Sequence, residues 1–278
     1  MLLVAGDFVR HTQTGVTLVE LMVAMVLGLW LAAAALQLGW RSSQTRLVQA
    51  AYAEMHDNAQ LALQLLTRDL QIAGYSAAQG VSVTAPSNTL VRGLKGPALF
   101  ACDDGFVAPL AAGLSCQTSG NSAALEVVFE ADAHNTSPTS SGVPADCLGN
   151  AVIPSNGLYL SRHRYFVQTL STGRSELHCA SGQSSQPLVD HVSQLAFSFG
   201  EALSADPSRA VRYVKASEVS DWGLVVAVRL CVLMQSADRV WTSEDSAAYV
   251  DCQGLKQTTS HYARQSFQTT VVLRNKSS

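Results

Sequence analysis

The chain has 278 residues, of which 47% are hydrophobic and only 14% are charged, with a formal net charge of −3. It is long enough for one or two domains with a buried core. Soluble domains usually carry about 25% charged residues, so the deficit argues against a free cytosolic enzyme, while the apolar content argues against a disordered chain. The acidic balance and the lack of any Lys/Arg block argue against a nucleic-acid partner, because phosphate binding requires basic residues.

The first expected element is an apolar helix over residues 16–40, in which Glu20 is the only charged residue. Roughly 25 helical residues, each rising about 1.5 Å, cross a hydrocarbon core of about 30 Å. The segment therefore predicts a single transmembrane helix. The alternative is a secretory signal cut near the small residues 32–35, but a basic region running directly into the apolar stretch is not present in good form.

The helix is expected to continue beyond the membrane segment as an amphipathic helix. Apolar residues recur there at three- and four-residue steps, which places them on one helix face. They are Leu47, Ala51, Met55, Ala59, Ala62, Leu66 and Ala73, interleaved with Arg46, Glu54, Asp57, Gln60, Arg68 and Asp69. No proline interrupts residues 16–74, and Gly74 is typical of the left-handed residue that ends a helix. We expect one long helix over 16–74, whose apolar stripe lies against a domain.

Residues 75–278 predict a β-rich external domain, because short apolar runs are separated by Gly, Ser, Pro and Asn. The expected strands are 124–130, 158–170, 188–199, 223–234 and 267–273. A turn at 171–173 is expected to join two strands, and residues 134–145 are expected to form an exposed loop. The most economical arrangement is one sheet covered on one face by the helix, so the expected fold class is α+β with a mostly antiparallel sheet.

The six cysteines all follow the membrane segment, and none forms a C-x-x-C pair. Zinc sites and thioredoxin-like redox motifs need such close pairs, so the set indicates disulfides formed in an oxidising compartment. Six cysteines allow 15 pairings, among which spacing alone does not decide. We expect the sequential set: Cys102 with Cys116, Cys147 with Cys179, and Cys231 with Cys252. Disulfides place the domain outside the cytoplasm, whereas positive residues flank both ends of the membrane segment and leave its orientation undecided.

The charge deficit belongs to the external domain itself, because charged residues are still only about 15% of the chain outside residues 16–40. Serine accounts for 29 of the 204 residues from position 75 onward. The solubility of this domain must rest on neutral polar groups, and such a surface is suited to packing against other subunits.

Residues 14–24, TGVTLVELMVA, place a glycine and one further residue before T-L-x-E-L-M-V at the head of the apolar helix. This pattern resembles the cleavage and methylation motif of type IV prepilins and pseudopilins, with residues 1–15 as a short cytoplasmic leader. The resemblance implies that a membrane-embedded prepilin peptidase cuts between Gly15 and Val16 and methylates the new amino terminus. The sequence departs from the family at Val16, where phenylalanine is usual.

Glu20 would be the fifth residue after that cut. An ionised side chain in mid-membrane costs about 2.5 to 3.5 kcal/mol on insertion scales, so it should have a partner. The resemblance implies that this carboxylate neutralises the amino terminus of a neighbouring subunit during assembly. The alternative is that Glu20 lies near the membrane surface and reaches water without any role.

Other segments resemble the minor pilins of the PilW type. Residues 67–75 resemble the end of their long helix and 262–275 their closing strand, and 187–192, 197–200 and 225–236 also fit, whereas 77–157 match nothing in the family. The resemblance implies a subunit that helps to prime the pilus and forms part of its tip, supporting twitching motility, adhesion or DNA uptake. Its implied partners are other minor pilins, the major pilin and a PilY-type adhesin. Before assembly it would be a single-pass inner-membrane protein with a periplasmic C terminus.

Two alternatives remain open. A J-type minor pseudopilin of a type II secretion system shares the processing motif, the long helix and a β domain. A membrane-anchored periplasmic hydrolase would need a histidine, a carboxylate and a nucleophile in one pocket, and the chain has no H-E-x-x-H, G-x-S-x-G, Walker A or dinucleotide motif. We interpret His163 and His178 as strand surface residues, and Asp103-Asp104-Gly105 lacks the alternating ligands of a calcium loop. We therefore assign no catalytic residue, cofactor or metal.

Overall fold

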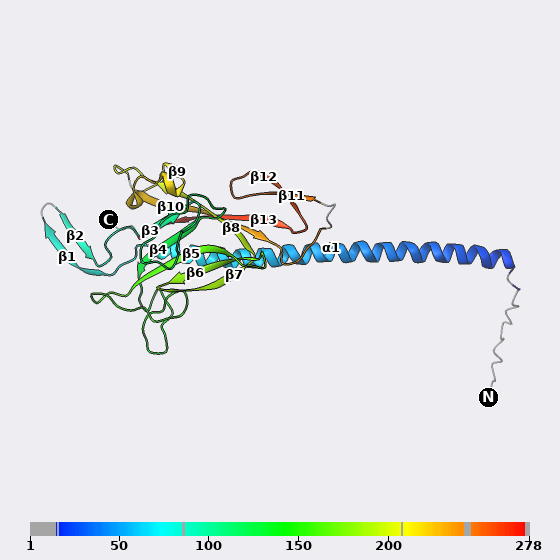
Figure 1. Ribbon diagram of the computed structural model, residues 1–278, viewed down its shortest axis with the longest axis horizontal. Coiled ribbons are helices and arrows are strands. Elements are labelled where there is room, and N and C mark those ends of the chain that lie inside the picture. Colours follow the sequence, from blue (N-terminus) through cyan, green and yellow to red (C-terminus); the bar gives the residue numbers. More distant parts are fainter. Residues whose placement is uncertain (1–14, 16, 85–86, 207, 242–245, 276–278) are drawn as a thin grey trace, which may run out of the picture. The chain divides into compact units, whose positions relative to one another are not determined.

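The computed structural model describes residues 15, 17–84, 87–206, 208–241 and 246–275 (Figure 1). The chain divides into two compact units, Met1–Gln49 and Ala50–Ser278. Helix α1, Leu18–Ile72, supplies most of the described part of the first unit. The second unit contains the remainder of α1 and all the described strands.

Helix α1 is a single helix of 55 residues. Thr17 caps its start, because the Glu20 N–H donates to Thr17 Oγ1 at 3.3 Å. Beyond Ile72, Gly74 adopts a φ of +74°, and a Cβ there would collide with the Asn275 carbonyl oxygen. Both the backbone conformation and the lack of space require glycine at this position. The expectation of one uninterrupted helix that ends near Gly74 is confirmed.

One sheet has five antiparallel strands in the order β3-β4-β5-β6-β7. The strands are β3 Leu99–Cys102, β4 Ala124–Glu130, β5 Leu160–Thr169, β6 Ser175–Ser181 and β7 Ser184–Asp190. Strand β4 has the expected bounds, and β5 lies within the expected 158–170. The turn expected at 171–173 joins β5 to β6, where the Gly173 N–H donates to the Leu170 carbonyl at 2.9 Å.

A second antiparallel sheet has four strands in the order β13-β10-β8-β9. The strands are β8 Val192–Glu201, β9 Arg212–Val214, β10 Val225–Gln235 and β13 Arg264–Val272. Strands β10 and β13 correspond to the predictions at 223–234 and 267–273. The single strand predicted at 188–199 is wrong, because β7 and β8 belong to different sheets and His191 between them has a φ of +62°.

The remaining described elements are short. Strands β1 Ala78–Thr84 and β2 Ser87–Arg92 form one hairpin, and β11 Ser246–Val250 and β12 Lys256–Ser260 form another. Two 3-10 turns, η1 Ala216–Glu218 and η2 Trp222–Leu224, precede β10. Residues 134–145 contain no helix or strand, as expected, apart from isolated bridges of Pro138 with Pro144 and of Ala145 with Ala151.

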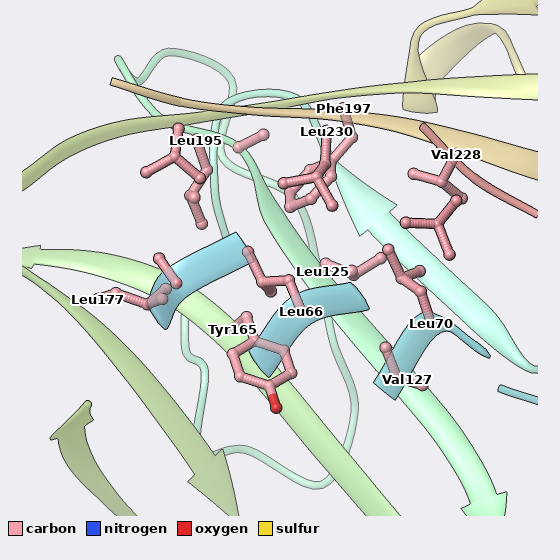
Figure 2. Close-up of a cluster of buried hydrophobic side chains, with 14 of the residues drawn as sticks. Leu66, Leu70, Leu125, Val127, Tyr165, Leu177, Leu195, Phe197, Val228 and Leu230 are labelled. Carbon is pink, nitrogen blue, oxygen red and sulfur yellow. The ribbon is translucent and has the colours of Figure 1, made fainter. Parts of the chain in front are cut away.

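The core of the second unit is built from the helix stripe and the inner faces of both sheets (Figure 2). The buried helix residues are Met55, Ala59, Ala62, Leu66, Leu70 and Ala73. In Figure 2, Leu66 and Leu70 of α1 lie beside Leu125 of β4, and Leu195 and Leu230 of the second sheet lie above them. The expected α+β class with a long helix on antiparallel strands is confirmed, but the stripe is covered by two sheets rather than one, and each sheet contributes one apolar face.

The six cysteines form the three expected sequential disulfides. These are Cys102–Cys116, Cys147–Cys179 and Cys231–Cys252, which close loops of 14, 32 and 21 residues. Each joins a strand of the second unit to a loop or turn beside it. Such cross-links restrict the unfolded chain and stabilise a domain whose loops are long.

Candidate assembly site

The N-terminal part of α1 is apolar on every side, and its large side chains are exposed. They include Leu18, Leu21, Met22, Val26, Leu29, Trp30, Leu31, Leu36 and Leu38. The most apolar 18-residue window of the helix has a mean hydropathy of 2.2, and none of it is buried. By length and composition this helix can cross a membrane. A helix without a polar face must be covered by lipid or by other apolar helices.

Glu20 is the one acidic residue in the first turn of α1, and its side chain is exposed. Its backbone N–H bonds to Thr17, and a carboxylate at this end of a helix interacts favourably with the helix dipole. Gly15 is also exposed. Val16 and residues 1–14 of the expected leader lie outside the described residues, so the cut between Gly15 and Val16 stays a prediction.

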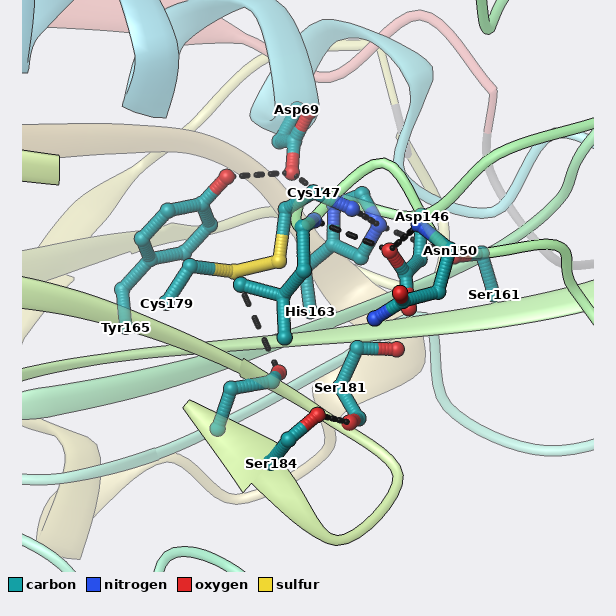
Figure 3. Close-up of a disulfide and its surroundings, with 12 residues drawn as sticks. Asp69, Asp146, Cys147, Asn150, Ser161, His163, Tyr165, Cys179, Ser181 and Ser184 are labelled. Carbon is teal, nitrogen blue, oxygen red and sulfur yellow. Dashed lines mark hydrogen bonds and ion pairs between the residues drawn. A yellow bond between two sulfur atoms is a disulfide. The ribbon is translucent and has the colours of Figure 1, made fainter. Parts of the chain in front are cut away.

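The C-terminal part of α1 carries a buried polar cluster around Asp69 (Figure 3). Asp69 Oδ2 accepts a hydrogen bond from the Tyr165 hydroxyl at 2.6 Å and lies 2.5 Å from His163 Nδ1. Both partners lie on β5, and all three residues are less than a tenth exposed. The cluster therefore joins the last turns of the helix to the five-stranded sheet.

The hydrogen bonds fix the tautomer of His163. The backbone N–H of Cys147 donates to His163 Nε2 at 3.0 Å, and Ser161 Oγ lies 2.9 Å from the same nitrogen. Because Nε2 accepts a hydrogen bond, the ring proton is on Nδ1 and is donated to Asp69. Burial, reinforced by the negative charge of Asp69, raises the pKa of Tyr165 well above its usual value. Tyr165 therefore stays a donor, and the Asp69 carboxylate is satisfied by two donors.

Ser161, His163 and Asp69 are connected in the order of a serine hydrolase triad. The nucleophile, however, must reach a substrate carbonyl. Ser161 is only 2% exposed, and it does not line the cavity of about 200 Å³ beside His163. The lone pair of Nε2 is also engaged by the Cys147 N–H. This geometry favours a structural role, in which His163 ties the helix end to the Cys147–Cys179 disulfide.

The interpretation of His163 and His178 as surface residues is wrong, since both are buried. His163 is retained in the core by the carboxylate of Asp69. His178 stacks on Phe166 with a centroid distance of 5.6 Å and lies 3.5 Å from Glu176. A single sequence gives no local signal for the environment of His163, because Asp69 is 94 residues from His163 in the chain.

Two possible metal sites can be judged from the described residues. The ligand atoms of Cys147, His163 and Cys179 lie within 4.8 Å of one another, but both sulfur atoms belong to one disulfide and offer no thiolate. The second is the segment Asp103-Asp104-Gly105. There the carboxylate of Asp103 accepts hydrogen bonds from the N–H groups of Ala216 and Ser217 at 2.9 and 3.0 Å. That carboxylate therefore caps the turn η1.

The chain just beyond α1 is fixed to the end of β4. Ser76 Oγ donates to Glu130 at 2.6 Å, and the Tyr75 hydroxyl donates to Asp132 at 2.8 Å. The hydrogen bond to Asp132 raises the pKa of Tyr75. Burial of Asp132 opposes its ionisation, but the hydrogen bonds from Tyr75 and from two backbone N–H groups together lower its pKa. The helix end is thus fixed by Asp69 and by the two residues that follow Gly74.

Comparison with known proteins adds two family matches. Residues 164–275 match the family described as Type IV Pilus-assembly protein W. Residues 10–36 match the prokaryotic N-terminal methylation motif. These matches support a PilW-type minor pilin. The PilW match runs from β5 to just beyond β13, and the methylation motif includes Gly15 and Glu20.

No match was found among curated proteins. A solved structure of a type IV-like pilin from Thermus thermophilus is similar, with 14% identity, coverage of 80% of this chain and 98% of that chain, and a TM-score of 0.40. The methylation motif and the apolar helix indicate anchoring in a membrane. The match to the pilus-assembly family supports interaction with other pilins.

Proposed function

We propose that this chain helps to prime assembly of a type IV pilus and remains in the complex at the pilus tip. The observation that carries this proposal is the N-terminal part of α1, which is apolar and exposed on every side and has one carboxylate in its first turn. Such a surface has no use in an isolated soluble protein, but it can be covered first by lipid and then by the helices of other pilins.

Processing at Gly15 prepares this helix for assembly. A prepilin peptidase cuts between Gly15 and Val16 and methylates the amine of Val16, which removes the leader 1–15. The new amine lies about one helical turn from Glu20. The mature helix therefore starts with a positive charge, followed closely by a negative one, ahead of a long apolar surface.

Glu20 guides the helix into register. A positive amine on one subunit and the carboxylate of Glu20 on its neighbour attract each other strongly in lipid, where the dielectric constant is low. A subunit that is displaced along the helix axis loses this pair and leaves two charges without partners, which costs several kcal/mol. The pair thus selects one axial position from many that the apolar contacts alone would permit.

The three disulfides support a periplasmic position for the domain, because such bonds form and persist in oxidising compartments. The chain would first span the inner membrane once, with its C terminus in the periplasm, and then leave with the growing pilus. Its partners are other minor pilins, the major pilin and a PilY-type adhesin, and the assembled tip supports twitching motility, adhesion or DNA uptake.

The test compares two variants in a strain that lacks the chromosomal gene. In Glu20→Ala the proposed assembly pair is lost, whereas Glu54→Ala removes another exposed carboxylate of the same helix, outside the membrane segment. Immunoblots measure each protein in membranes and in sheared pili. We expect both variants in membranes at the wild-type level and only Glu54→Ala in the pili. Wild-type incorporation of Glu20→Ala would contradict the proposed role of this carboxylate.

A deletion strain separates the pilus from the secretion alternative. A pilus subunit predicts loss of surface pili and twitching with normal secretion of type II substrates. A J-type pseudopilin predicts the opposite result, in which secretion fails and pili are retained.

A further inference from the structure

A groove crosses the outer face of the four-stranded sheet, the face turned away from α1. Its floor includes Gln194, Ala196 and Ser198 of β8, which alternate with the core residues of that strand. Asp103, Asp104 and Lys215 line one side, and the turn between β11 and β12 lines the other with Cys252 and Gln253. The cavity has a volume of about 460 Å³, which is within the range of small-ligand sites.

Two neighbouring hollows extend this groove along the sheet. One of about 270 Å³ runs over Arg229 and Gln268, and one of about 360 Å³ is lined by Tyr249 and Gln257. Gln253 lines all three hollows. The three together form an extended site rather than a pocket for a single compact molecule.

The side that carries Gln253 is held rigidly in place. The disulfide Cys231–Cys252 fixes the turn to the central strand β10. The carboxylate of Asp251 accepts hydrogen bonds from the N–H groups of Gln253 and Leu255 and from the side chain of Gln257, all at 2.9 Å. The backbone of the turn is therefore fixed at Gln253.

The opposite side is fixed in a similar way. The disulfide Cys102–Cys116 closes the loop that follows Asp103, and the Asp103 carboxylate caps the turn that follows Lys215. Two of the three disulfides thus brace the two sides of one groove. A site that is already shaped loses little conformational entropy when a ligand binds.

Charged groups of both signs line the groove, with Asp103, Asp104 and Lys215 in the first hollow and Arg229 and Arg264 in the other two. Arg229 lies over the ring of Tyr213 at 3.9 Å, and Arg264 bonds to Gln235 at 2.9 Å. By contrast, the side-chain amides of Asn121, Gln194 and Gln253 form no hydrogen bond with any other described residue. Each of these amides supplies both donors and an acceptor to a ligand.

We propose that this groove binds a neutral oligosaccharide. Adjacent hydroxyl groups of a sugar can each donate and accept a hydrogen bond, which matches the side chains of Asn121, Gln194 and Gln253. The half-buried ring of Tyr249, over which the guanidinium of Arg264 lies at 5.7 Å from the centroid, also lines the groove. Because charges of both signs line the groove, neither a polyanion nor a polycation is favoured, and the polar lining disfavours an apolar helix. An extended groove fits a chain of sugar units.

Sugar binding goes beyond the proposed role in assembly and can be measured on the purified protein. The full chain in detergent micelles is screened by saturation-transfer NMR against maltohexaose, cellohexaose, chitohexaose and a linear galactan fragment. Dextran sulfate serves as the polyanionic probe. We expect saturable binding of at least one neutral oligosaccharide.

Three variants test whether the sugar occupies the groove. The double variant Gln194→Ala/Gln253→Ala removes two amides and should weaken binding about tenfold, as the loss of two hydrogen bonds predicts. Ala196→Trp fills the floor and should abolish binding. Gln183→Ala changes an exposed glutamine in the turn between β6 and β7 and should bind as wild type. Near-ultraviolet circular dichroism establishes that each variant is folded.

Several results would overturn the proposal. They are the absence of saturable binding to all four neutral probes, binding of dextran sulfate alone, and unchanged binding by folded Ala196→Trp. Equal binding of the sugar by the double variant and by the wild type would show that the sugar occupies another site. None of these results bears on whether Glu20→Ala enters the pilus, so the two proposals fail separately.

Discussion

The two parts of helix α1 have similar helical geometry but opposite surroundings. Before residue 50, Leu31 is 73% exposed, and the charged residue of the first turn is exposed as well. After residue 50, Leu66 is fully buried between two sheets, and Asp69 is buried with two partners. One helix thus has a surface that its own chain buries and a surface that must be covered by lipid or by other apolar helices.

The difference shows how the chain separates folding from assembly. The stripe that ends at Ala73 alternates with polar residues, so only one face of the helix is buried by the domain. Residues 18–40 of the earlier segment have no polar face and can be covered from any direction. Substitutions in the later segment should therefore change the stability of the domain, whereas substitutions in the earlier one should change its association.

The largest contrast is expected between two leucines of α1. Leu66→Ala leaves a cavity in the core and should lower the free energy of unfolding by about 2 to 5 kcal/mol. Leu31→Ala, at an exposed position, should change it by less than about 0.5 kcal/mol. Urea unfolding of the full chain in detergent, followed by near-ultraviolet circular dichroism, measures both. Equal losses would remove the distinction between the two segments.

Asp69→Ala should have the next largest effect, a loss of about 3 kcal/mol, because His163 and Tyr165 stay buried without their shared acceptor. Asp69→Asn retains an acceptor oxygen and should lose less. The same unfolding assay measures both variants. A loss below about 0.5 kcal/mol for Asp69→Ala would show that the cluster does not hold the helix end to the sheet.

Tyr165→Phe should cost about 1 kcal/mol at neutral pH, the contribution of one hydrogen bond. The pKa of Tyr165 is raised in the folded protein, so its stabilising effect is present below the unfolded pKa of about 10 and is lost as the pH rises from there toward the folded value. Melting temperatures from pH 8 to 11 should therefore fall less steeply for Tyr165→Phe than for wild type. Tyr75, whose pKa is also raised, accounts for part of the remaining slope. Identical slopes would exclude Tyr165 as a source of alkaline destabilisation.

The smallest effect on folding is expected for Glu20→Ala. Its exposed carboxylate contributes only to the helix start, so the free energy of unfolding of the domain should change by less than about 0.5 kcal/mol. The variant is informative because the same substitution should prevent entry into the pilus. A large loss of stability would mean that Glu20 acts in folding rather than in assembly.

The sequence predicted those features that depend on local pattern. The helical spacing of apolar residues, the lack of proline and the position of Gly74 were sufficient to predict the whole of α1. The alternation of apolar and polar residues was sufficient to predict β4 and β10. The break at His191 could not be predicted, because a non-glycine residue with positive φ interrupts a continuous apolar pattern. The hairpins β1–β2 and β11–β12 were not predicted, because their strands are rich in polar and small residues.

The features that were not predicted depend on contacts between distant residues. Asp69 looked like one more polar residue of an amphipathic helix, and its burial becomes evident only when β5 brings His163 and Tyr165 to it. The second sheet was missed because its strands carry the same alternation as those of the first. The groove over β8 depends on two disulfides and on a turn more than 50 residues away in the chain.

The most direct test of the central claim is the mass and sequence of the amino terminus of the protein recovered from sheared pili. A prepilin processed for assembly should begin at Val16, with the mass of one added methyl group on its amine. An uncut chain in the pili, or a mature terminus after residues 32–35 as expected for a secretory signal, would contradict the assignment of the exposed part of α1 to pilus assembly.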